Sequence, residues 1–144
     1  MGDADLDGWP DLAVTSSNGP AELLVNRTDA SANRLVVRLR GRRANRDALG
    51  ARVWLTPLNE SAVADAAHEQ MYELSSSGSY LSQNAAEIYA GLGAAGAARI
   101  TVRWPGGEME RIEAAAAGQI LLIVEGRGIV ARRPLNDRSP DSGR

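Results

Sequence analysis

Apolar and polar residues alternate with a period of two in several segments of the chain, which is typical of half-buried β-strands. Residues 35–40 place leucine or valine at positions 35, 37 and 39 and arginine at positions 38 and 40. Residues 52–56 and 99–104 alternate in the same way, and residues 119–125 are apolar on both faces, as a central strand is. Weaker strand patterns occupy residues 11–15, 22–26, 69–74 and 129–132.

Turn-forming residues separate these segments at roughly ten-residue spacing, which favours an all-β fold. Residues 104–108 read Trp-Pro-Gly-Gly-Glu and predict a hairpin turn, because Pro105 cannot donate to a strand ladder and the glycines accept positive φ. The alanine-rich residues 62–68 and 114–117 predict two short helical turns. The pattern as a whole predicts an antiparallel β-sandwich or a barrel-like domain.

The composition limits the class of protein. The chain has 144 residues, which fits one ordinary domain, and its 16 basic and 18 acidic residues give a net charge of -2, which argues against a polyanion-binding protein. It has no cysteine, which excludes disulfides, thiolate metal sites and a cysteine nucleophile. No segment reaches the ~18 continuous apolar residues that span a bilayer, so we expect no membrane insertion.

The charges are distributed in blocks. Residues 1–22 carry carboxylates and no arginine, whereas residues 27–52 carry eight arginines against two aspartates. The last dozen residues are rich in Pro, Ser, Asp and Gly and predict a disordered tail. At the N-terminus, Met1 runs directly into a polar loop without the features of a signal peptide, so we expect a fragment of a longer protein.

The most informative motif is a nine-residue acidic loop with aspartates at positions 1, 3, 5 and 9. These residues are Asp3, Asp5, Asp7 and Asp11. Gly8 at position 6 permits a sharp turn, so the carboxylates can converge on one point, and the Trp9 carbonyl at position 7 adds a ligand. Such an oxygen cage suits Ca²⁺, whereas Mg²⁺ prefers a tighter octahedron with more water. An EF-hand is excluded because its position 12 falls on Val14; a solvated acidic turn without metal is the alternative.

The acidic loop and the following residues 23–27 resemble the calcium loop and closing strand of an FG-GAP repeat, the unit of integrin α-type β-propellers. Six further motifs resemble, in order, the ASPIC/UnbV domain of FG-GAP proteins related to cartilage acidic protein. They are LVVRLRG at 35–41, NRDALGARV at 45–53, GSYLSQ at 78–83, GLG at 91–93, VRWPGG at 102–107 and AGQ at 117–119. The family usually has Gly and Phe where this chain has Ala48 and Ala90, which implies a smaller core near Gly91.

The resemblance divides the chain into three parts. Residues 1–30 would be the terminal part of an FG-GAP or VCBS-type repeat, with the calcium loop as the remnant of a propeller blade. Residues 31–127 would be an ASPIC/UnbV-like β domain, and residues 128–144 the last short strand and the tail. The resemblance implies an extracellular or periplasmic protein, with the rest of the propeller in cis, that uses calcium in adhesion or recognition of a protein or carbohydrate ligand.

Residues 79–83 form a candidate ligand loop. Ser79, Tyr80, Ser82 and Gln83 offer hydrogen-bond donors, acceptors and an aromatic ring that can stack on a sugar. The alternative, which we favour, is structural: Tyr80 and Leu81 anchor the loop to the core, and the polar side chains satisfy its backbone.

Three arginines in the basic block are candidates for contact with an acidic partner or an anionic glycan. They are Arg40, Arg42 and Arg43. Nucleic acid is not expected as a partner, because no aromatic residues are interleaved with these arginines as base-stacking platforms.

Catalysis has little support in the sequence. His68 is the single histidine and has no neighbouring nucleophile motif, and nothing distinguishes Glu69 and Glu73 as a hydrolytic carboxylate pair. We therefore expect a non-catalytic, calcium-associated adhesion or recognition module. The alternative is an accessory or catalytic domain of a polysaccharide-acting enzyme. A concave face with convergent carboxylates near Trp54 or Trp104 would favour the enzyme, and a flat face rimmed by arginine would favour recognition.

Overall fold

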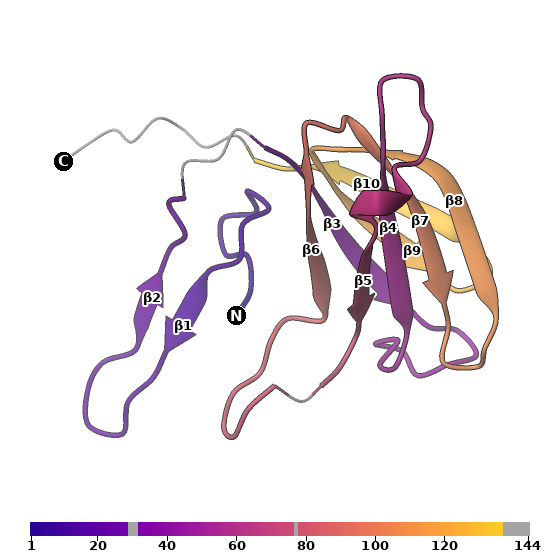
Figure 1. Cartoon of the computed structure of the whole chain (residues 1–144). Coiled ribbons are helices and arrows are strands. Elements are labelled where there is room, and N and C mark those ends of the chain that lie inside the picture. Colours follow the sequence, from indigo (N-terminus) through magenta and orange to yellow (C-terminus); the bar gives the residue numbers. More distant parts are fainter. Residues whose placement is uncertain (29–31, 77, 137–144) are drawn as a thin grey trace.

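The computed structural model of the chain describes residues 1–28, 32–76 and 78–136. Within these residues, ten strands form one two-stranded hairpin and two four-stranded sheets. The two larger sheets pack face to face, while the hairpin extends away from them (Figure 1). The all-β sandwich predicted from the period-two pattern is therefore confirmed.

The strand bounds and sheet orders are as follows. The hairpin consists of β1 (Leu12–Val14) and β2 (Glu22–Leu24). The first sheet, here the β3 sheet, has the order β10 (Gly128–Pro134), β9 (Gln119–Val124), β3 (Asn33–Arg40) and β6 (Glu87–Gly93). The second, the β4 sheet, has the order β5 (Gln70–Glu73), β4 (Arg52–Leu58), β7 (Ala97–Arg103) and β8 (Met109–Ala116).

One strand pair departs from the expected antiparallel arrangement. Among the pairings in the described chain, β3 and β9 run parallel, with Val37 opposite Leu121, while the others are antiparallel. The chain between these strands builds the whole β4 sheet before it returns, which supplies the long crossover that a parallel pair requires. As predicted, β9 is a central strand, flanked by β3 and β10.

Alternate residues of both sheets enter one hydrophobic core. Leu35 and Leu121 of the β3 sheet face Val53 and Leu55 of the β4 sheet, and all four are 0% exposed. Trp104, just after β7, is the largest of the fully buried side chains. At the open edge of the sandwich, Gln70 Nε2 of β5 donates to the Gly91 carbonyl of β6 at 2.7 Å and so links the two sheets.

Two strands and one helical turn differ from the sequence-based expectations. The pattern did not predict β6 or β8, since β6 is rich in glycine and β8 ends in alanines, all of which favour other conformations. The helical turn expected at 114–117 is wrong, because residues up to Ala116 pair with β7. The turn expected at 62–68 is confined to a 3-10 helix, η1 (Ala66–His68), which Asp65 caps.

The C-terminal strand β10 runs through Pro134, two residues into the segment assigned to the tail. Residues 137–144, where the remainder of the tail was expected, lie outside the described residues. No helix within residues 1–28, 32–76 and 78–136 is long and apolar enough to cross a membrane.

A buried carboxylate holds the arginine-rich loop after β3. Glu125 is 3% exposed, and its Oε2 accepts the N–H groups of Arg42 and Arg43 at 2.7 Å and of Ala44 at 3.0 Å. The N–H groups of Ala44 and Arg42 lower the pKa of Glu125 below its ordinary value of 4.5. The loop therefore has a fixed internal anion at its centre.

Replacing Glu125 by glutamine removes this anion. Because its pKa is lowered in the fold, the stabilisation by Glu125 is complete above pH 4.5 and is lost as the pH falls through the lowered value. We expect Glu125→Gln to lower the melting temperature at neutral pH and the difference from the wild type to shrink below pH 4.5. Melting curves down to about pH 3 measure this effect. The control variant Glu60→Gln, which changes an exposed carboxylate, should have the melting temperature of the wild type. If the melting temperature of Glu125→Gln lay below that of the wild type by the same amount at every pH, the role of Glu125 as a structural anion would be contradicted.

Truncation of a central core residue should lower the free energy of unfolding far more than truncation of a surface residue. Leu121→Ala leaves a cavity at the centre of β9, so we expect the free energy of unfolding to fall by about 2–5 kcal/mol. Val130 on β10 is 47% exposed, and Val130→Ala should stay within about 0.5 kcal/mol of the wild type. Urea denaturation measures both values, and equal costs would show that β9 does not occupy the core.

Candidate metal centre and ligand surfaces

The acidic loop closes on itself through a short antiparallel bridge. Gly2 N–H donates to the Asp11 carbonyl at 3.1 Å, and Asp11 N–H donates back to the Gly2 carbonyl. The sharp turn expected at Gly8 is present, with φ of 88°, and Leu6 has φ of 62°, a left-handed conformation that costs a leucine about 1–3 kcal/mol. The surrounding contacts thus hold the loop in a tightly wound, strained form.

Three carboxylates meet inside this loop. Oxygen atoms of Asp3, Asp5 and Asp11 lie within 4.8 Å of one another. Asp5 Oδ1 is buried and has no hydrogen-bond partner among the described residues, so it is available as a ligand atom. Asp7 lies outside this group; it is 2% exposed, and its Oδ1 accepts the Trp9 N–H at 2.8 Å. The structure therefore brings together three of the four predicted aspartates.

Backbone N–H groups hold two of these carboxylates in place. Asp3 accepts the N–H of Asp7 at 3.1 Å and that of Gly8 at 2.8 Å. Asp11 accepts the N–H of Asn26, just after β2, at 2.8 Å. Because these bonds already fix the side chains, little conformational entropy remains to be lost when an ion binds.

The charges inside the loop are poorly compensated. Burial raises the pKa of Asp3, and the charge of Asp7 raises it further, against the opposing effect of the Gly8 N–H. The guanidinium of Arg27 lies 3.6 Å from Asp5, but the two side chains are 70% and 41% exposed, so this pair contributes little. A cation at the centre of the loop would relieve the repulsion.

A hard cation fits this donor set. Ca²⁺ takes roughly six to eight oxygen ligands in a flexible geometry, and the converging carboxylates and the orphaned oxygen of Asp5 meet that preference. Asp3, Asp5 and Asp11 would hold the ion, and the further ligands expected from Asp7 and the Trp9 carbonyl stay predictions. The ion would supply positive charge and a cross-link between the two ends of the loop.

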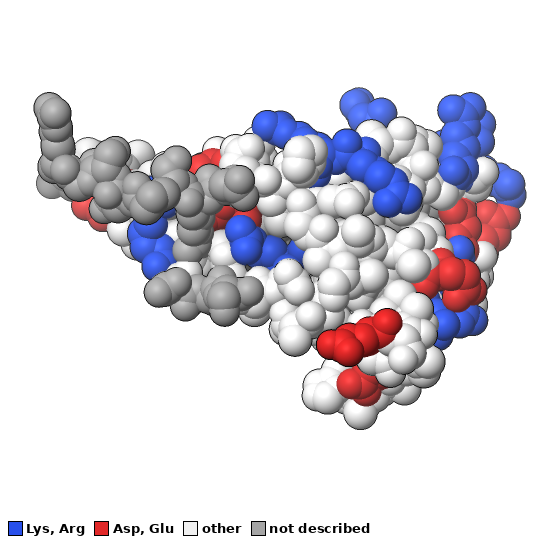
Figure 2. Space-filling model, turned by 90° about the horizontal axis from the view of Figure 1, so that it is seen from above, with Lys and Arg blue, Asp and Glu red and all other residues white. Residues whose placement is uncertain are grey.

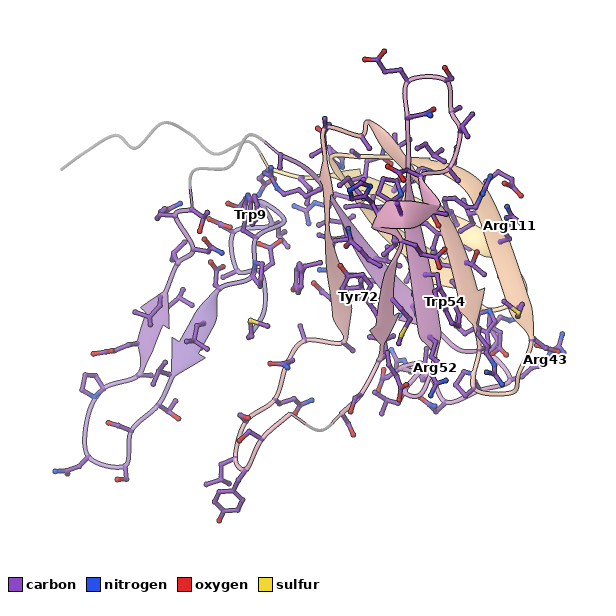
Figure 3. The ribbon with its side chains drawn as sticks, viewed as in Figure 1. Trp9, Arg43, Arg52, Trp54, Tyr72 and Arg111 are labelled. Carbon is purple, nitrogen blue, oxygen red and sulfur yellow. The ribbon has the colours of Figure 1, made fainter. Side chains whose placement is uncertain are left out.

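The acidic loop is attached to the sandwich by residues that the sequence analysis did not identify. Arg34 of β3 donates from Nε to the Asp7 carbonyl, and its guanidinium carbon lies 5.4 Å from the centroid of the Trp9 ring. Figure 3 shows Trp9 in the acidic loop, beside the two large sheets. Asn136 donates from its side chain to the Asp5 carbonyl and from its backbone to the Leu6 carbonyl, the latter at 2.8 Å. Arg34 and Asn136 are too far apart in the sequence for a local motif to connect them with the loop.

The candidate ligand loop at 79–83 is fully open to solvent at its tip. Tyr80 is 90% exposed and Leu81 is 89% exposed, so the favoured interpretation, in which both anchor the loop to the core, is wrong. Ser82 Oγ donates to the Ser79 carbonyl at 3.1 Å, and the Gln83 carbonyl accepts the N-terminal amine at 3.1 Å. The ring of Tyr80 is thus free to contact a partner, and the ligand role of the loop stays a prediction.

The three arginines of the candidate anionic-partner patch are differently placed. All three are exposed, and Arg43 in addition forms an ion pair with Glu108 in the β7–β8 hairpin. The backbone beneath this patch already binds Glu125. The patch therefore has less free positive charge than its sequence indicates.

A groove of about 890 Å³, which no sequence motif indicated, lies between the β4–η1 connection and the β6–β7 turn. Leu58, Leu92 and Ala95 contribute apolar lining, and Asp65 and His68 contribute polar lining. Figure 2 views the molecule from this end and shows a large uncharged area with carboxylates to one side. The volume is that of a small-molecule site. Its walls come from segments distant in the sequence, which explains why no motif revealed it.

The metal centre predicts a stability change that depends on calcium. If the dissociation constant is that of extracellular calcium modules, ~0.1 to 1 mM, then ~1 mM calcium stabilises the fold by roughly 0.4 to 1.4 kcal/mol, a few degrees in melting temperature. Asp5→Ala removes the least constrained ligand and should abolish this shift. Glu22→Gln removes an exposed carboxylate of β2 and should retain it. Identical wild-type melting curves with calcium and with chelator would exclude the site.

Comparison with known proteins adds the family. The ASPIC and UnbV family matches residues 41–130, which are 90 of the 144 residues and include the whole β4 sheet, β6, β9 and the start of β10, while β3 lies before the match. The acidic loop lies outside the match, so its resemblance to an FG-GAP repeat stays a hypothesis. No curated protein and no solved structure matches the chain. Because the family match spans more than half of the residues, the chain belongs to the ASPIC and UnbV family.

Proposed function

We propose that this protein is a non-catalytic recognition module in which a calcium ion fixes the acidic loop against the sandwich. The observation that carries the proposal is the double role of the loop. Its interior brings the carboxylates of Asp3, Asp5 and Asp11 together, and its backbone is bonded to Arg34 and Asn136 of the sandwich. An ion that orders the loop therefore also orders the junction between the loop and the sandwich.

The hairpin β1–β2 is joined to the same loop. Asn26 donates to Asp11 from its backbone and to the Pro10 carbonyl from its side chain, at 3.3 Å. Apolar side chains of the hairpin, such as Leu23 at 55% and Leu24 at 53%, are largely exposed, and an isolated two-stranded hairpin is only marginally stable. These features support an arrangement in which further strands of an FG-GAP propeller cover the hairpin in cis. Such a protein would act in the extracellular space or the periplasm.

The surface around Trp54 supports binding rather than glycoside hydrolysis. Glu73 is paired with Arg52 at 2.8 Å, and Glu113 is paired with Arg99 and Arg111, both at 3.1 Å. Glycoside hydrolysis needs one carboxyl group as an acid and another as a base or nucleophile. Carboxylates held by arginines suit an adhesive surface better, so a protein or carbohydrate ligand is favoured over the polysaccharide-acting enzyme.

A glycan array probed with the full chain in calcium and in chelator tests the proposal. We expect binding that is stronger in calcium, because the ion orders the junction on which recognition depends. In calcium, the Asp5→Ala variant should bind glycans only as strongly as the wild type does in chelator. The Glu22→Gln variant should still bind glycans more strongly in calcium than in chelator. Equal binding of the wild type in calcium and chelator would contradict the role of the ion, and absence of any glycan ligand would direct the search to protein partners.

A further inference from the structure

The outward-facing side of the β4 sheet presents a flat row of polar and aromatic side chains. Val53 and Leu55 point into the core, so Arg52 and Trp54 of the same strand point outward (Figure 3). Trp54 is half-buried and lies between Met71 of β5 and Thr101 of β7 in register. This outer face belongs to neither the metal centre nor the groove.

Two like charges lie opposite each other at one end of this face. Arg52 of β4 and Arg103 of β7 are register partners in antiparallel strands. Like charges in such positions destabilise a sheet unless something compensates them. Glu73 compensates Arg52, but Arg103 is exposed and has no ion-pair partner within the described residues. The arrangement therefore leaves one positive charge without an acid.

A small cavity lies at this arginine pair. It has a volume of about 220 Å³ and is lined by Gly50, Arg52, Arg103, Trp104 and Pro105. Trp104 is 1% exposed and belongs to the hydrophobic core, so the polar atoms that a ligand can reach in this cavity are those of the arginines. The lining thus contains two arginines that differ in their partners: the Nε of Arg52 is bonded to Glu73 at 2.8 Å, whereas Arg103 has no ion-pair partner within the described residues. The guanidinium group of Arg103 is the complement of an oxyanion.

An aromatic ring lies next to this cavity. Trp54 is two residues beyond Arg52 on the same face of β4, which places the two about 7 Å apart along the strand. A half-exposed indole offers a flat apolar surface, and the neighbouring guanidinium groups offer planar donors for a carboxylate. A ligand that carries a carboxylate on a flat ring would contact the guanidinium groups and the Trp54 indole at the same time.

We propose that this corner of the β4 sheet binds an acidic saccharide, with a uronate carboxylate between Arg52 and Arg103 and a sugar ring against Trp54. The inference rests on the proposed recognition function and deepens it by naming its ligand class. An acidic peptide could supply the carboxylate, but its side chain would leave Trp54 without a ring to cover it, so the saccharide fits the whole surface better.

Isothermal titration calorimetry on the full chain, in low salt and calcium, tests the assignment. The probes are a β-1,4-linked glucuronate hexamer, the glucose hexamer of the same linkage, and a glutamate hexapeptide. We expect the glucuronate hexamer to bind at least about tenfold more tightly than either other probe, because only it supplies both the charge and the ring. Equal binding of the glucose hexamer would overturn the oxyanion site, and equal binding of the glutamate hexapeptide would overturn the saccharide assignment.

Variants locate the site. Arg103→Gln should weaken glucuronate binding about tenfold or more, and Arg103→Lys should retain part of it. Arg132→Gln removes an exposed arginine from β10 in the opposite sheet and should bind like the wild type. Wild-type affinity in Arg103→Gln, with its melting temperature unchanged, would overturn the proposal. The calcium-induced melting shift, measured on the same samples, separates the two hypotheses: a normal shift without glucuronate binding overturns this inference alone.

Discussion

The parallel pairing of β3 with β9 determines where the loops at both ends of these strands lie. At one end, the Glu125 N–H donates to the Arg40 carbonyl at 3.0 Å, which leaves the Glu125 carboxylate beneath the arginine-rich loop. At the other end, the Gly118 N–H donates to the Arg34 carbonyl at 2.8 Å, and β10 then returns the chain to bring Asn136 against the acidic loop. A slip of one residue in this pair would turn the core side chains of β9 outward, so core packing fixes the register and, with it, both loops.

The protein contains two sites with buried carboxylates, Glu125 and the acidic loop, and these sites differ in how far the protein itself compensates the charge. Glu125 receives three backbone N–H groups, which match its oxygen so well that its pKa falls and the carboxylate acts as an internal structural anion. In the acidic loop, Asp3 is also hydrogen-bonded, yet burial raises its pKa and Asp5 keeps an oxygen without a donor. The first site is complete without a ligand, whereas the second is arranged so that an external cation completes it.

The sequence predicted those parts of the structure whose cause is local. The alternation in β3, β4 and β7 and the doubly apolar β9 follow from burial on one or both faces. The spacing of the aspartates predicted that the carboxylates of Asp3, Asp5 and Asp11 meet, but it was wrong in adding Asp7 to that group. Strands β6 and β8 were missed because pairing with β3 and β7 overrides the preferences of glycine and alanine. The exposure of Tyr80 was missed because hydrophobicity alone does not show whether a loop reaches the core. Arg34, the groove and the Arg52–Arg103 pair depend on long-range register, which a local pattern does not contain.

The hydrogen bond from Gln70 to Gly91 also affects how copies of this protein meet one another. Strands β5 and β6 are the edges of their sheets on the same side of the sandwich, and an uncovered edge is a template on which another chain can add a strand. The Gln70 side chain donates a hydrogen bond to the Gly91 carbonyl, an acceptor that an incoming strand would need for pairing with β6. The same bond joins the β5 and β6 edges across the opening of the sandwich. At a high local concentration, this side chain would help to keep neighbouring molecules from pairing edge to edge into a continuous sheet.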